Sequence, residues 1–198
     1  MLKDLTQLDL VGGYSFGSLR VGVDVPLILN AQGSLPTGDS FSESALGDLA
    51  VDLKYRVTRE DAPVGVSVSV RGQFPTSETN AAISSSEPMS EGELTVDTKQ
   101  DKIHVSANIG HREQTDFSYE RSVFGSQIYV RGGLGFVPDD AKGASFEFVT
   151  SRLYEFIDSA DAFSSEALVS GWTKQGNIVV RGGVGMGIGS GIGTPQWR

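Results

Sequence analysis

Apolar and polar residues alternate one by one along most of this chain. In the segment 48–57, Val51 and Leu53 fall on one face of an extended strand, and Asp52 and Lys54 fall on the other. Successive side chains of a β-strand point to opposite faces, so the segment predicts a two-faced strand. Because the pattern recurs with charges on the polar face, it is typical of a transmembrane β-barrel, apolar toward lipid and polar toward the lumen.

The alternation predicts about ten antiparallel strands in one all-β domain spanning residues 1–198. These strands cover 8–16, 19–29, 46–58, 64–74, 92–99, 102–112, 125–137, 144–156, 166–174 and 177–188. The pattern is weaker in the strands near 144–156 and 166–174, where Phe148-Val149 and Leu168-Val169 interrupt it. The fold predicted is an up-and-down meander that is closed, or nearly closed, into a barrel.

The connections between the predicted strands alternate in length. Short ones fall at 16–18, 59–63, 100–101, 138–143 and 174–177, and long ones at 30–45, 75–91, 112–124 and 157–165. Bacterial outer-membrane barrels have short periplasmic turns and longer extracellular loops.

Aromatic residues gather near both sets of connections, as in the two girdles that flank the apolar band of a barrel. Those near the short connections are Tyr14, Phe16, Tyr55, Phe136, Phe146 and Trp172; those near the long ones are Phe41, Phe74, Phe117, Tyr119, Phe124, Tyr154, Phe156 and Phe163.

Composition fits this interpretation and excludes others. Apolar residues make up 38% of the 198 residues, and no apolar run reaches the roughly 18 residues of a transmembrane helix. The formal net charge of −9 argues against a nucleic-acid partner. Cysteine is absent, so disulfides and thiolate metal sites are excluded. The first residues do not form a signal peptide, so an exported barrel implies a mature fragment or an added Met1.

The charged residues of the polar faces are the candidate site. With both signs in a narrow lumen, they are expected to pair across strands, because an unpaired charge away from water is costly. The arginines of three Val-Arg-Gly motifs, Arg71, Arg131 and Arg181, are central to this prediction. The full set is Arg20, Asp24, Asp52, Lys54, Arg56, Arg71, Glu93, Asp97, Lys99, Arg131 and Arg181. The alternative is a water-filled pore whose charged lining selects solutes.

Three segments resemble the amino-terminal barrel of OmpA-family outer-membrane proteins, in which the barrel precedes a peptidoglycan-binding domain. They are 19–29 (LRVGVDVPLIL), 46–56 (LGDLAVDLKYR) and 72–76 (GQFPT). The final segment, 187–198, is similar to the hairpin before the last strand of such a barrel. The resemblance implies a bacterial, Gram-negative outer-membrane location and contact with membrane lipid. It implies peptidoglycan as a partner only through a domain that these residues lack. With the strand directions, it suggests that one strand is missing at each end of a twelve-stranded barrel.

Catalytic and metal sites are weakly supported. His104 and Ser106 share a face, but a catalytic histidine also needs an orienting carboxylate. His104 and His111 lie on opposite faces, which disfavours a shared metal. Glu155, Asp158 and Asp161 lack the spacing of a known calcium loop. No cofactor is expected.

The sequence therefore predicts a non-enzymatic envelope-structural barrel. The alternatives are a narrow porin-like passive channel for small solutes and, third, a soluble β-sandwich that binds a partner.

Overall fold

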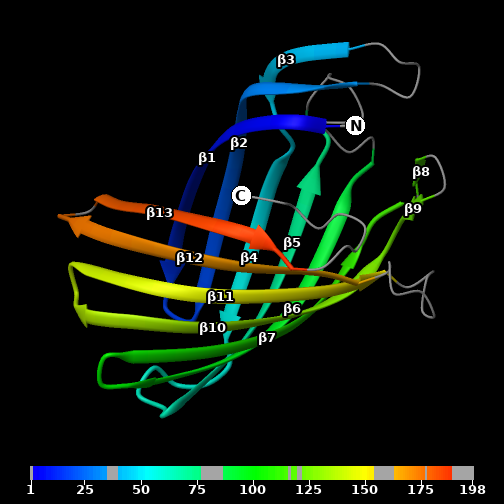
Figure 1. Ribbon diagram of the computed structural model, residues 1–198. Helices are drawn as coiled ribbons and strands as arrows, with labels where there is room; N and C mark the ends of the chain where they lie inside the picture. Colours follow the sequence, from blue (N-terminus) through cyan, green and yellow to red (C-terminus); the bar gives the residue numbers. More distant parts are fainter. Residues whose placement is uncertain are drawn as a thin grey trace.

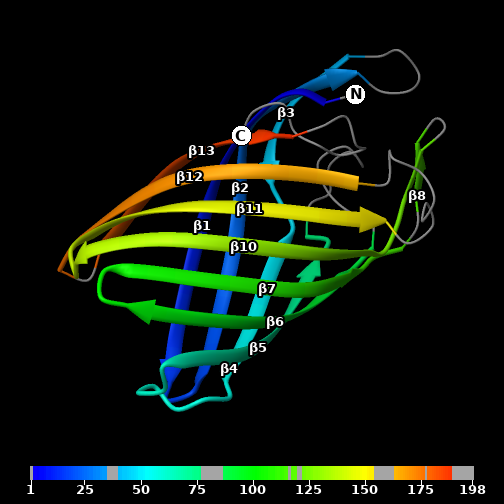
Figure 2. The ribbon, with the colours of Figure 1, turned by 60° about the horizontal axis from the view of Figure 1, so that its bottom comes forward.

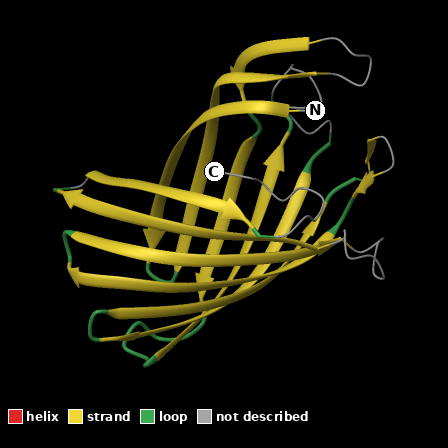
Figure 3. Cartoon of the chain, in the orientation of Figure 1, coloured by secondary structure: helices red, strands yellow, loops and turns green. Residues whose placement is uncertain are grey.

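The computed structural model describes residues 2–34, 40–76, 87–115, 117–119, 122–153, 163–176 and 178–188. These residues form strands and turns (Figure 3). No helix among them is long and apolar enough to cross a membrane. The strands are β1 (Leu2–Phe16), β2 (Leu19–Ser34), β3 (Ser40–Leu46), β4 (Leu49–Arg56), β5 (Val64–Phe74), β6 (Met89–Gln100), β7 (Ile103–Glu113), β8 (Phe117–Tyr119), β9 (Ser122–Phe124), β10 (Gln127–Asp139), β11 (Lys142–Leu153), β12 (Phe163–Gln175) and β13 (Ile178–Gly187).

One antiparallel sheet contains eleven of these strands. Its order is β1-β2-β4-β5-β6-β7-β10-β11-β12-β13, with β3 also paired to β2, while β8 and β9 form a separate small hairpin. The sheet curls into a half-barrel with a concave and a convex face (Figures 1 and 2). The predicted all-β antiparallel meander is therefore confirmed. Within the described residues the half-barrel is open, since β1 and β13 are its two edges.

The short hairpins gather at one end of the half-barrel. Two residues connect β1 to β2, β6 to β7, β10 to β11 and β12 to β13. Gly17, Asp101 and Gly176 take positive φ angles at three of these turns, as tight hairpins require. At the fourth, the Asp139 carboxylate accepts hydrogen bonds from the backbone N–H groups of Ala141 and Lys142. The strand ends that lead into the long connections, and the β8–β9 hairpin, lie at the opposite end (Figure 1).

The predicted strand 46–58 is wrong at its start, because the chain breaks there into β3 and β4. Both strands pair with β2, and Gly47 and Asp48 separate them. On β2 this break faces Pro26, which has no N–H to give to a ladder. The Gly47 N–H donates instead to the Pro26 carbonyl at 2.8 Å. The predicted long connection 30–45 is also too long, since β2 extends to Ser34 and β3 begins at Ser40.

The distribution of apolar side chains is the reverse of that in a water-soluble domain. Most large apolar side chains of the sheet lie on the convex face and are exposed, among them Val68 (45%), Ile109 (48%) and Leu134 (51%). Buried positions include the polar residues Ser67 and Thr95 of the concave face. The described residues contain no large side chain that is fully buried. The sheet is therefore held by its hydrogen-bond ladders and by its concave polar contacts, without a dry apolar core.

The space around glycine residues shows that side chains are more crowded on one face of the sheet than on the other. A Cβ added to Gly110 would collide with the ring of Tyr129, its cross-strand neighbour, and one added to Gly133 would come within 2.6 Å of Ser106 Oγ. Both glycines point to the concave side. Added to Gly132 or Gly182, which point to the convex side, a Cβ would meet nothing within 4 Å. Glycine therefore provides the room in which larger concave side chains lie flat across the sheet.

We expect Gly110→Ala to destabilise the protein by about 1–3 kcal/mol, the usual cost of overpacking. The Tyr129 ring cannot move away without losing the contacts of its hydroxyl group. Gly132→Ala, on the next strand but on the open face, is the matched control and should be neutral. Thermal unfolding in detergent, followed by circular dichroism, measures both. Equal effects of the two substitutions would contradict this account of the crowded face.

Candidate functional site

The candidate site is the concave face of the half-barrel. The pairing register places all eleven charged residues predicted from sequence on this face. They come from six strands: β2, β4, β5, β6, β10 and β13. One face of one sheet therefore carries both positive and negative side chains over most of its width.

Three ion pairs on this face each reach across an intervening strand. Arg71 of β5 contacts Asp24 of β2 at 2.7 Å, over β4. Arg131 of β10 lies 3.5 Å from Glu93 of β6, over β7. Arg181 of β13 contacts Glu147 of β11, over β12. These side chains meet because the curl of the sheet brings the concave side chains of next-nearest strands together.

Tyr129 lies at the centre of the most densely connected part of the site. Its hydroxyl group is 2.6 Å from Glu91 Oε1 and 3.0 Å from Glu93 Oε2. A phenol has one proton, so it donates to one carboxylate at a time. Only 4% of Tyr129 is exposed, and the guanidinium group of Arg131 lies 5.3 Å from the centre of its ring. The tyrosine therefore connects two acidic residues that would otherwise repel each other.

Further donors satisfy the same two carboxylates. Arg112 donates from Nε and Nη2 to one oxygen of Glu91, at 3.0 and 2.8 Å. Thr95 and Asn108 each donate to Glu93 Oε1 at 3.1 Å. We call Glu91, Glu93, Arg112, Tyr129 and Arg131 the central cluster. With two acidic and two basic members, the central cluster is electrically neutral although the whole chain is acidic.

A second group of contacts surrounds Arg181 nearer the edge of the sheet. Besides Glu147, the Arg181 guanidinium group donates to Ser170 Oγ at 2.9 and 3.1 Å and to Ser145 Oγ at 3.2 Å. Ser145 in turn donates to Glu147 at 3.1 Å. Three adjacent strands, β11 to β13, are therefore linked through one arginine.

The remaining predicted charges share the face without forming ion pairs among the described residues. They are Arg20, Asp52, Lys54, Arg56, Asp97 and Lys99. Asp52 lies over Gly22, and Asp97 and Arg56 both approach the space above Gly65. The prediction that Asp52 and Asp97 pair with arginines is therefore not reproduced, and glycine leaves these carboxylates room beside the backbone instead.

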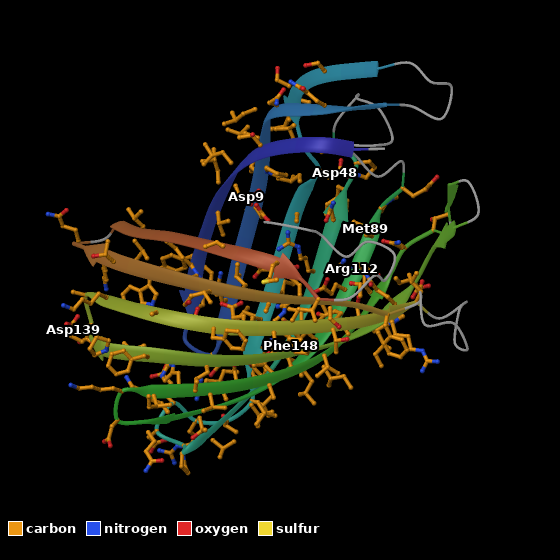
Figure 4. All side chains as sticks on the ribbon, viewed as in Figure 1. Asp9, Asp48, Met89, Arg112, Asp139 and Phe148 are labelled. Carbon is orange, nitrogen blue, oxygen red and sulfur yellow. The ribbon has the colours of Figure 1, made fainter. Side chains whose placement is uncertain are left out.

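Two hollows open on the concave face. One, of about 240 Å³, lies toward the long connections and is lined by Arg71, Gln73, Met89, Glu91 and Arg112. Figure 4 labels Met89 and Arg112 at this end and Asp139 at the opposite, short-hairpin end. The other hollow, of about 420 Å³, extends past the central cluster to Trp172 and Arg181.

Trp172 corrects the predicted aromatic girdle. It lies near a short hairpin as expected, but on the concave face, with its indole ring over Gly143. Tyr14, Phe16, Tyr55, Phe136 and Phe146 of the same predicted girdle are exposed on the convex face. Of the girdle near the long connections, Phe74 and Phe163 are exposed; the side chains of Phe41, Phe117, Tyr119, Phe124, Tyr154 and Phe156 lie outside the described part.

The two histidines point to opposite faces of β7, as the alternation predicts. His104 and Ser106 both point to the concave face, two residues apart, with their backbones about 7 Å apart along the strand. His111 points to the convex face, 3.6 Å from Glu113. The weak calcium candidate at Glu155, Asp158 and Asp161 lies outside the described residues.

Four members of these clusters were not among the predicted charges: Glu91, Arg112, Tyr129 and Glu147. Glu91 points to the same face as Glu93 on β6, Tyr129 to the same face as Arg131 on β10, and Arg112 to the same face as His104 on β7. Extending each polar face along its strand would have found these three residues. The partners of Arg131 and Arg181 could not be found in this way, because their pairs join strands that are not consecutive in the sequence.

No protein-family model matches the sequence, and no curated protein matches it.

We expect Tyr129→Phe to lower the free energy of unfolding by about 1.5–3 kcal/mol, the range for a hydrogen bond to a charged group. The change removes only the hydroxyl group, so the ring still fills the space over Gly110. Tyr55→Phe, on the exposed convex face, is the control and should have little effect. Thermal melts of the two variants in the same detergent test this, and indistinguishable melting temperatures would contradict a central role for Tyr129.

Proposed function

We propose that this chain is a bacterial outer-membrane β-barrel, similar to the OmpA-family barrel, with a structural role in the cell envelope and no enzymatic activity. The observation that supports this most is the reversed distribution of side chains. Exposed apolar residues cover the convex face of β4 to β7, β10 and β11, while hydrogen-bonded charges occupy the concave face.

Lipid is the environment that suits such a convex face. On water-soluble monomers the largest apolar patches measure a few hundred Å², and larger ones mark interaction surfaces. A β-sandwich would cover its apolar face with a second sheet. Here the only other sheet among the described residues is the β8–β9 hairpin, with three residues in each strand. The sandwich alternative is therefore the weakest of the three functions considered.

Membrane insertion would also explain why the short hairpins and the long connections leave from opposite ends of the sheet. Short hairpins at one end and long connections at the other match the periplasmic and extracellular ends of bacterial barrels. In the bilayer, unpaired backbone groups cost several kcal/mol each, so the edges at β1 and β13 must be paired in the assembled barrel. Two further strands between them would give the twelve-stranded barrel proposed from the sequence.

Substitutions on the two faces of β5 test this proposal. Val68 points outward and Ser69 points inward, where Glu93 is its cross-strand neighbour. An arginine facing the middle of a bilayer costs about 2–4 kcal/mol. Val68→Arg should therefore reduce folding into lipid vesicles strongly, whereas Ser69→Arg should be tolerated. Protease protection after vesicle refolding measures insertion, and equal tolerance at both positions would reject the membrane assignment.

A narrow passive channel is the second candidate, and the charged hollows on the concave face favour it. Against an open pore stand the ion pairs, which draw side chains of different strands across the concave face. We therefore propose a blocked or very narrow lumen rather than the open lumen of a porin.

Arg71→Ala distinguishes the two candidates in planar bilayers. In a blocked lumen, loss of the Arg71–Asp24 pair should lower the melting temperature and raise ion leakage above a low wild-type level. Arg59→Ala, at an exposed turn, should change neither. Large, stable conductance of the unmodified protein, with altered ion selectivity in Arg71→Ala and unchanged stability, would instead establish the channel.

A further inference from the structure

On the convex face of the described strands, Arg152 would face lipid in the proposed barrel. Arg152 is the second-last residue of β11, and its register neighbours are Ile128 of β10 and Phe163 of β12. Both neighbours are exposed apolar residues of the convex face. All three lie at the end of the sheet where the long connections leave it, so they belong to the rim of the apolar surface.

Arg152 differs from the arginines of the concave clusters in its partners. Arg71, Arg112, Arg131 and Arg181 each contact a carboxylate. Among the described residues, none with a carboxylate forms an ion pair with Arg152, and its Nε is covered without a hydrogen-bond partner. Its guanidinium carbon lies 4.9 Å from the centre of the Phe163 ring. The aromatic ring therefore lies beside the cation, and no carboxylate of the described residues pairs with it.

A second basic side chain lies in the same cross-strand row. His111 of β7 is the register neighbour of Ile128 on its other side. Since neighbouring strands are about 4.8 Å apart, the backbones at His111 and Arg152 are separated by about 10 Å, with Ile128 between them. Glu113 lies two residues further along β7 and contacts His111, not Arg152. In this row, Ile128 lies between His111 and Arg152, and Phe163 lies on the other side of Arg152.

From this arrangement we propose that Arg152, with Phe163 and Ile128, binds the phosphate of a lipid headgroup at the rim of the barrel. The proposal rests on the membrane location proposed above. An arginine at a membrane interface extends its charge to the headgroup layer while its aliphatic part stays on apolar surface. Phosphate matches the planar donors of a guanidinium group, and acyl chains of the same lipid would cover Ile128 and Phe163.

Native mass spectrometry of the detergent-solubilised protein, titrated with phosphatidic acid, tests the site. Wild type should retain the phosphatidic acid in preference to phosphatidylcholine. R152Q should bind it about tenfold more weakly, as expected for loss of one charge-assisted contact worth about 1.4 kcal/mol. R152K, which keeps the charge, should recover part of the affinity. R59Q, which removes an arginine at the opposite end of the sheet, should bind as wild type does.

Two results would overturn the proposal. Equal binding by R152Q and wild type would show that the lipid binds elsewhere. Displacement of phosphatidic acid by inorganic phosphate at similar concentration would show that a free anion, not a lipid, is the ligand. Circular dichroism checks that each variant is folded. Insertion of wild type into phosphatidylcholine vesicles, measured separately, reports on the membrane proposal itself, so a failure of the lipid site and a failure of membrane location remain distinguishable.

Discussion

Bending a β-sheet draws together the side chains on its concave face and spreads those on its convex face, because successive residues point to opposite sides. In this protein the concave positions beneath a ring or a carboxylate are glycines: Gly110 under Tyr129 and Gly22 under Asp52. Two glycines that point outward, Gly132 and Gly182, have no neighbours within 4 Å of an added Cβ. The curvature of the sheet therefore depends on where glycine stands as much as on the alternation of apolar residues.

The ion pairs depend on the same curvature. In a flat sheet, residues two strands apart are about 10 Å from each other at the backbone, which discourages contact between short acidic and long basic side chains. Curling shortens that separation, so Asp24 and Arg71 meet at 2.7 Å although β4 lies between their strands. Each such contact in turn opposes flattening. Among the described residues, no ion pair joins next-nearest strands on the convex face, where the apolar side chains are exposed.

The sequence predicted strands and faces well because both follow from a period of two, which is local. It predicted the break between β3 and β4 poorly, since that break depends on Pro26 lying opposite Gly47 and Asp48 after pairing. Trp172 was misplaced for a related reason: its distance from a hairpin is local information, whereas its position over Gly143 follows from register. The partners of Arg131 and Arg181 required knowledge of three-dimensional curvature, which no single strand contains.

The zero net charge of the central cluster would affect how the proposed lumen treats ions. Tyr129 has one proton for two carboxylates, so Glu91 relies more on Arg112, and Glu93 on Thr95, Asn108 and the more distant Arg131. The pairs are thus coupled through one hydroxyl group, and disturbing either carboxylate changes the partners left for the other. A cluster with no net charge gives a passing ion little long-range attraction or repulsion. A lumen crossed by it would therefore exclude solutes by occupying space, and selectivity for the sign of charge would arise only after one member was lost.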